Sequence, residues 1–148
     1  MTKREETTYD TDWSFNSCFG CGPDNPIGLK LIFHKDGENT VGKFTPSELY
    51  QGWEGLVHGG IITCLLDEAM AYAARFETGN LTCVTARIEA KLKRPTSTGE
   101  PLLISAAVTR RTKKLLETRA SVSSQDGILI AEGKSTQFIV EESNKDTQ

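Results

Sequence analysis

The stretch Gly55-Leu-Val-His-Gly-Gly-Ile-Ile-Thr-Cys-Leu-Leu-Asp-Glu-Ala-Met70 decides the fold of this chain. Its His-Gly-Gly turn opens an apolar helix, predicted over residues 60–76, which Gly79-Asn80 ends. Free N–H groups and the positive end of the dipole allow a helix start to bind an oxyanion. Asp67 lies about two turns inside the helix, where a carboxylate is costly unless it is paired, neutralised or used. The stretch therefore offers an oxyanion site and a candidate base or nucleophile.

The predicted helix is apolar on most of its circumference, so it must be buried along more than one stripe. The remaining sequence predicts about six strands, near residues 29–33, 40–44, 85–93, 102–109, 116–123 and 128–140. Asp36-Gly37 and Gln125-Asp126-Gly127 predict hairpin turns between neighbouring strands. We therefore predict an α+β fold in which an antiparallel sheet wraps around one long central helix.

The strand predicted over residues 85–93 alternates between apolar and polar side chains. The apolar residues from Ala86 to Leu92 share one face, whereas Thr85 shares the opposite face with Arg87 and further charged residues. This pattern is typical of a half-buried strand. Because faces and edges of the predicted sheet are partly apolar, we also expect a partner subunit.

Length and charge limit the classes of protein to consider. We expect one domain over residues 1–148, with flexible polar ends at 1–15 and 142–148. The chain has 17 basic and 20 acidic residues, a net charge of −3, and no Lys/Arg block that would indicate nucleic acid binding. The N-terminus lacks an apolar signal segment, and Asp67 and Glu68 interrupt the longest apolar stretch, so no membrane span is predicted. We expect a cytoplasmic protein.

The four cysteines do not define a metal site by themselves. Cys18 and Cys21 have the spacing of metal ligands, but a structural zinc site needs two more ligands. A redox pair is an alternative, although the surroundings differ from the thioredoxin context. We interpret the pair as part of a Gly-rich loop and expect no metal and no cofactor. Cys64 is interpreted as a small core residue.

The combination of motifs resembles the hotdog-fold acyl-CoA thioesterases, and among them the phenylacetic-acid-degradation thioesterase group. The resemblance covers roughly residues 18–140 and rests on His58-Gly59-Gly60 followed by Asp67, on Thr85-Ala-Arg-Ile-Glu-Ala-Lys-Leu-Lys-Arg-Pro95, and on Gly99-Glu-Pro-Leu102. It implies hydrolysis of acyl-CoA thioesters to a free acid and coenzyme A. It also implies a homodimer or a dimer of dimers, with active sites at the subunit interface.

The resemblance further assigns roles to single residues. It implies that the Gly59 N–H binds the oxyanion, that Asp67 acts as nucleophile or general base, and that His58 orients the loop or the substrate. A strand threonine that positions water corresponds to Thr85. Substrate-binding candidates are Gly60, Gln51 and the basic residues Lys91, Lys93 and Arg94, whose cluster suits the phosphates of coenzyme A.

The spacing along the helix predicts how such a site is assembled. Gly59 and Asp67 are eight residues apart, which is about 12 Å along a helix at ~1.5 Å per residue. A base or nucleophile must lie within hydrogen-bond reach of the reacting atoms. Because one helix can hardly supply both groups to one carbonyl, we predict that they come from different subunits.

Simpler interpretations exist for each candidate taken alone. His-Gly-Gly can be a tight turn before a helix, Thr85 an ordinary strand threonine, and the basic residues a solvated strand face. Glu68 is interpreted as a structural group. Two other functions suit the predicted fold. A hotdog hydratase or dehydratase usually pairs its carboxylate with a histidine, and none follows Asp67. A non-catalytic acyl-CoA-binding protein usually carries an extra regulatory segment, for which this length leaves no room.

Overall fold

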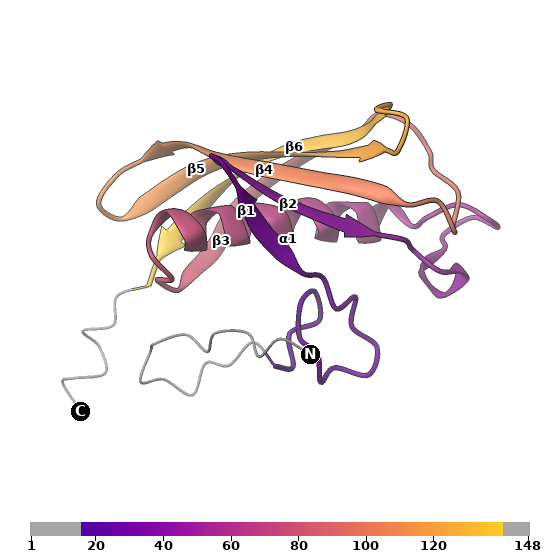
Figure 1. Ribbon diagram of the computed structural model, residues 1–148, viewed down its shortest axis with the longest axis horizontal. Coiled ribbons are helices and arrows are strands. Elements are labelled where there is room, and N and C mark those ends of the chain that lie inside the picture. The colour runs from indigo at the N-terminus through magenta and orange to yellow at the C-terminus, as the bar shows by residue number, and fades with distance from the viewer. Residues whose placement is uncertain (1–15, 141–148) are drawn as a thin grey trace.

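One long helix, α1 (Gly59–Glu77), packs against one face of an antiparallel sheet in the computed structural model, which describes residues 16–140 (Figure 1). In this part of the chain six strands form the sheet, in the order β1-β2-β4-β5-β6-β3. Their bounds are β1 Phe33–Asp36, β2 Asn39–Phe44, β3 Cys83–Leu92, β4 Leu102–Arg111, β5 Leu115–Ser124 and β6 Leu129–Ile139. A short 3-10 helix, η1 (Glu48–Tyr50), precedes α1. The predicted α+β hotdog fold is confirmed, whereas both ends expected to be flexible, 1–15 and 142–148, lie outside the described residues.

The helix begins and ends within one residue of the sequence prediction, 60–76. His58 is its N-cap and Thr78 its C-cap. Gly79 follows with a φ of 73°, the left-handed conformation that glycine adopts without strain. The Asn80 N–H then donates to the Arg75 carbonyl at 2.7 Å and satisfies one of the last free carbonyls of the helix.

The core lies between α1 and the sheet, as a broadly apolar helix requires. Leu65, Leu66, Ala69 and Met70 of α1 are completely buried. Full burial of one large apolar side chain stabilises a fold by about 1.5–3 kcal/mol, so this contact fixes the helix firmly on the sheet. The helix thereby fixes the position of Asp67 in its middle. No helix within residues 16–140 has the length and apolar character needed to cross a membrane.

The first strand begins later than the sequence predicts. The alternation of Leu29, Leu31 and Phe33 predicts a strand from Leu29, but β1 starts only at Phe33. Leu29 and Leu31 are buried, and their N–H groups donate at 2.9 Å to the carbonyls of Phe19 and Gly20. These residues therefore pair with the preceding loop instead of a sheet neighbour. The loop of residues 16–28 is thus tied to the body of the protein.

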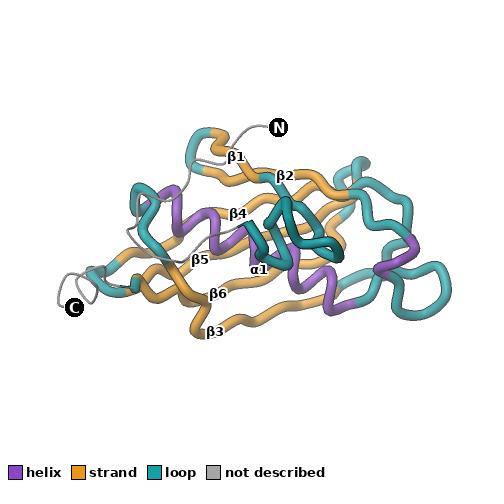
Figure 2. The backbone as a smooth tube through the Cα atoms, turned by 90° about the horizontal axis from the view of Figure 1, so that it is seen from below, coloured by secondary structure: helices purple, strands orange, loops and turns teal. Residues whose placement is uncertain are grey.

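The strands β1 and β3 form the two edges of the sheet (Figure 2). β3 is ten residues long, pairs with β6 on one side and leaves most of its residues exposed. Its exposed residues include the large apolar side chains Val84, Ile88 and Leu92. A long edge strand with exposed apolar residues is a template for pairing with another chain.

Candidate active site

A carboxylate from the middle of α1 meets a hydroxyl group from β3. Thr85 Oγ1 donates a hydrogen bond to Asp67 Oδ1 at 2.7 Å. Hydrogen bonds to an ionised acceptor are shorter and roughly twice as strong as neutral ones. The other carboxylate oxygen, Oδ2, has no hydrogen-bond partner among residues 16–140. The contact therefore orients Asp67 and leaves one of its oxygens available, and it brings together two of the predicted catalytic residues.

A bulge in β3 turns Thr85 toward the helix. Strict alternation predicts Thr85 on the face opposite Ile88, and this prediction was wrong. Thr85 pairs with Gln137, whereas Arg87 pairs with Thr136, so β3 contains one extra residue at this point. Such a bulge reverses the alternation along the strand. Thr85 and Ile88 therefore both face α1.

Three further polar side chains extend the Asp67–Thr85 contact into the core. Gln137 Nε2 donates to Thr85 Oγ1 at 3.0 Å and to Ser135 Oγ at 2.8 Å. Ser135 Oγ lies 2.6 Å from Thr118 Oγ1. All three added residues are buried, Gln137 completely. Buried polar groups are costly unless they are hydrogen-bonded, and here each one has a partner. We call these five residues, Asp67, Thr85, Gln137, Ser135 and Thr118, the polar chain.

The start of α1 presents one free backbone N–H group. His58 Nδ1 accepts a hydrogen bond of 2.8 Å from the Gly60 N–H, so the imidazole caps the helix. The Ile61 and Ile62 N–H groups donate to the His58 carbonyl. The Gly59 N–H has no acceptor among residues 16–140. Of the predicted residues at this end, Gly59 is therefore the one with an N–H left to donate, and His58 orients the turn.

A hollow of about 150 Å³ lies beside Gly59. Its walls include Leu92, Lys93 and Arg94, so the structure brings two of the predicted basic residues to the start of the helix. Lys93 also forms an ion pair with Glu132 at 3.6 Å, in which the two side chains are 45% and 40% exposed. A site with a free N–H and two nearby cations suits an anionic ligand.

Two other residues predicted to bind substrate, Lys91 and Gln51, do not line this hollow. Lys91 lines a separate hollow of about 310 Å³ that also includes residues of β4, β5 and β6. Gln51 is exposed, and its Oε1 accepts the Gly55 N–H at 2.9 Å within the same loop. The side chain of Gln51 thus supports the turn that leads into α1.

The loop that contains the first two cysteines covers Glu68, the residue after Asp67. Cys18 Sγ lies 3.8 Å from Glu68 Oε1, and a Cβ atom at Gly20 would collide with the Glu68 carboxyl group. Hydrogen bonds from the Cys21 thiol and from the N–H groups of Cys21 and Gly20 lower the pKa of the Cys18 thiol to about 5, although burial opposes this. Burial, followed by the charge on Cys18, raises the pKa of the Glu68 carboxyl to about 7. Sequence reasoning missed this contact.

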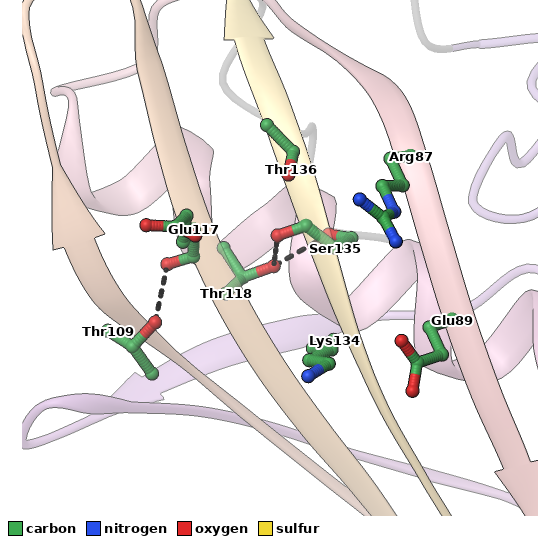
Figure 3. A pocket seen from close by; sticks show the side chains of 8 residues that line it. All are labelled: Arg87, Glu89, Thr109, Glu117, Thr118, Lys134, Ser135 and Thr136. Carbon is green, nitrogen blue, oxygen red and sulfur yellow. Dashed lines mark hydrogen bonds between the residues drawn. The ribbon is translucent and has the colours of Figure 1, made fainter.

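A polar hollow of about 220 Å³ lies on the sheet, and Thr118 and Ser135 of the polar chain are among the residues that line it (Figure 3). Charged side chains from β3, β5 and β6 surround it, among them Arg87, Glu89, Glu117 and Lys134. Glu89 pairs with Lys134 on the sheet face away from α1. None of the predicted catalytic residues lines this hollow.

Comparisons with known proteins agree with this architecture. A family model described as the thioesterase superfamily matches residues 54–131, more than half of the chain. The match includes α1, β3, β4 and β5, and thus both Gly59 and Asp67. The chain belongs to the thioesterase superfamily, and this membership indicates thioester hydrolysis. No curated protein matches the chain.

Several solved structures share the fold. A thioesterase superfamily protein with a TM-score of 0.72 is 24% identical; the match covers 82% of this chain but only 61% of that one. Zebra fish thioesterase superfamily member 2 has a TM-score of 0.70 and 21% identity, with 80% of this chain and 87% of that chain covered. The Escherichia coli PaaI protein from the phenylacetic acid degradation operon has a TM-score of 0.68 and 19% identity, with 76% and 81% covered. At these identities the likeness supports the fold.

Proposed function

We propose that this protein hydrolyses acyl-CoA thioesters to a free acid and coenzyme A. The observation that carries the proposal is the oriented carboxylate of Asp67, which Thr85 holds by one oxygen on a helix whose start offers the free Gly59 N–H. Thioester hydrolysis needs an activated nucleophile at the carbonyl carbon and a donor for the developing oxyanion. Asp67 supplies the first function and Gly59 the second.

Two chemical routes are open to Asp67. As a general base it takes a proton from water, the hydroxide adds to the carbonyl carbon, the C–S bond breaks, and the coenzyme A thiolate leaves and is protonated. As a nucleophile, one Asp67 oxygen adds to the carbonyl carbon, the C–S bond breaks and the coenzyme A thiolate leaves and is protonated; water then hydrolyses the mixed anhydride to the free acid and the Asp67 carboxylate. A single turnover in H₂¹⁸O tests the nucleophilic route: label in the Asp67 peptide indicates a mixed anhydride that water opens at the aspartyl carbon.

We propose a homodimer, or a dimer of dimers, in which two chains share each site. The distance of about 12 Å along α1 separates Gly59 from Asp67 within one chain. The exposed apolar side chains of the edge strand β3 support an interface beside these residues. Two antiparallel copies of α1 bring the start of one helix near the middle of the other, so one thioester meets Gly59 of one chain and Asp67 of its partner.

The basic residues define the coenzyme A end of the proposed site. Lys93 and Arg94 lie in the hollow beside Gly59, where their charges suit the phosphates of the nucleotide. Lys91 lies on a neighbouring part of β3 and lines a separate hollow. We assign it to the same ligand through the long-range attraction between its charge and the phosphates. We place the reaction in the cytoplasm, in keeping with the four free cysteines.

The alternative functions have less support from the site. The chain contains two histidines. His58 caps α1 through Nδ1, and His34 lies exposed on β1. Among residues 16–140, neither histidine has the carboxylate partner that hydration or dehydration uses. A non-catalytic acyl-CoA-binding protein would have no need for an oriented carboxylate beside the substrate.

A hydrolysis screen tests the proposal. Short, long and aromatic acyl-CoAs are incubated with the full chain, and the release of coenzyme A is followed by chromatography, with the Asp67→Asn variant as control. We expect at least one acyl class to be hydrolysed by the wild type and not by the variant. Tight binding of acyl-CoA without turnover would instead support the binding protein and overturn the proposal.

A further inference from the structure

The loop of residues 16–28 holds two cysteines in a fixed arrangement against the side of α1 that carries Glu68. The Gly22 N–H donates to the Cys18 carbonyl at 2.8 Å, which closes the turn between the two cysteines. Cys21 is buried, and the backbone contacts of Phe19 and Gly20 with residues 29–31 anchor the loop from the other side. The two sulfur atoms are therefore positioned by the fold.

Three potential metal ligands converge where this loop meets the helix. The sulfur atoms of Cys18 and Cys21 and a carboxylate oxygen of Glu68 all lie within 4.8 Å of one another. Zn–S bonds of about 2.3 Å at tetrahedral angles require sulfur atoms about 3.8 Å apart. The observed cluster is therefore already close to the size of a zinc site.

The donor atoms of this cluster indicate which ion suits it. Two thiolates and a carboxylate suit a divalent ion of borderline softness such as zinc, and they suit magnesium or calcium poorly.

We propose that Cys18, Cys21 and Glu68 bind one zinc ion, with water in the fourth position, and that this ion fastens the N-terminal loop to α1 beside Asp67. Two ligands come from the Cys-x-x-Cys motif, and the third comes from the helix 47 residues after Cys21. The sequence alone shows two ligands, which is why it led us to expect no metal. The site lies next to the thioesterase residues but does not depend on the proposed hydrolysis.

Metal content and spectroscopy test this site on the full chain. Protein from zinc-supplemented cultures, purified under reducing conditions, is analysed by mass spectrometry for metals. Metal-free protein is then titrated with Co²⁺, which reports thiolate ligands and tetrahedral geometry through its absorption. We expect about one zinc ion per chain and an intense cobalt spectrum with sulfur-to-metal charge transfer.

Four variants define the ligands. Cys18→Ser, Cys21→Ser and Glu68→Gln should each weaken zinc binding at least about 10–100-fold, the loss caused by removing even an outer partner of a ligand. Cys83→Ser is the matched control, because Cys83 is a half-buried cysteine of β3 outside the cluster, and it should bind zinc like the wild type. Zinc should raise the melting temperature of the wild type and of Cys83→Ser, and leave that of Cys18→Ser unchanged.

Several results would overturn the zinc site. One is a wild-type chain that takes up neither zinc nor cobalt after full reduction. The same holds if Cys18 and Cys21 are first found in a disulfide and the chain still binds neither metal once that disulfide is reduced. Another is retention of the ion at wild-type affinity by any of the three ligand variants. If the ligand variants fail to fold, removal of zinc from the wild type by a chelator and recovery of the cobalt spectrum decide the question.

Discussion

The hydroxyl group of Thr85 donates a hydrogen bond of 2.7 Å to Asp67 Oδ1 and so joins the edge strand β3 to the middle of α1. The two residues are 18 positions apart in the sequence. A bulge in β3 makes this contact geometrically possible. Since the contact orients the proposed catalytic carboxylate, each of its partners gives a direct test of the proposed site.

Asp67 is the first target. The Asp67→Ala variant should fold like the wild type, because the side chain is half-buried and bonded through one oxygen. Its turnover should fall at least ~100-fold, the scale of losing general-base assistance. Steady-state kinetics measure this loss, and circular dichroism verifies the fold. A well-folded variant with near-wild-type turnover would remove Asp67 from the mechanism.

Thr85 tests the orientation of that carboxylate. Thr85→Val keeps the shape of the side chain but removes a donor to a charged acceptor, which is worth about 1.5–3 kcal/mol. We expect kcat to fall about 10–100-fold with little change in KM, and Thr85→Ser to recover most of the loss. Equal activity of the valine and serine variants would contradict the assigned role.

Gln137 tests the buried part of the polar chain. Gln137→Met leaves Thr85 without a buried donor and removes the contact with Ser135, so the free energy of unfolding should fall by about 1–3 kcal/mol. The exposed Gln125 lies in a hairpin turn, and Gln125→Met is the matched control. Urea denaturation of both variants measures the difference. Equal stability would show that the buried amide contributes nothing.

Two variants of His58 distinguish a role in helix capping from a direct role in catalysis. His58→Ala removes the acceptor for the Gly60 N–H and should cost about 0.5–2 kcal/mol of stability. His58→Asn supplies another capping acceptor, so it should recover both stability and activity. Thermal melts and kcat/KM for the two variants give the answer. Recovered stability with activity still absent would indicate that the imidazole itself acts on the substrate.

A mixed dimer tests whether two chains share each site. Gly59→Pro removes the proposed N–H donor at the first position of the helix, where proline is tolerated. Within residues 16–140, a Cβ atom there meets only Leu92 Cδ1, at 2.9 Å, which is the movable end of a side chain. Each homodimer, Gly59→Pro or Asp67→Ala, should be inactive. Tagged mixed dimers should recover up to half of the wild-type activity, because one site then has both groups intact.

The control for this experiment is Gly59→Ala, which adds a Cβ atom but keeps the N–H group. It should remain active if the donor, and not the absence of a side chain, is what matters. Well-folded mixed dimers as inactive as their parents would mean that both groups act within one chain, or that Gly59 is not the oxyanion donor.

Most of the fold could be predicted because it depends on local periodicity. The apolar run over 60–76 and the Gly79-Asn80 stop set α1, and both hairpin turns are confirmed. The face of Thr85 could not be predicted, because a bulge depends on pairing between strands and leaves no periodic signal.

The remaining parts of the site depend on contacts between distant segments. Glutamine is a polar residue type that is usually exposed on a strand. The burial of Gln137 is explained only by its hydrogen bonds to Thr85 and Ser135, which come from the folded structure. The approach of Glu68 to Cys18 joins residues 50 positions apart. A polar residue at an inward position of an alternating strand is the sequence signal that could have indicated Gln137.

The buried side chains of Gln137, Ser135 and Thr118 also have a consequence for how the strands find one another during folding. A purely apolar layer tolerates a slip of two residues, because similar side chains still point inward. In this protein such a slip of β6 against β5 or β3 would bury an amide and hydroxyl groups without partners, at about 1–3 kcal/mol each. The three buried side chains therefore select a single offset between the three strands, in addition to supporting the Thr85 contact with Asp67.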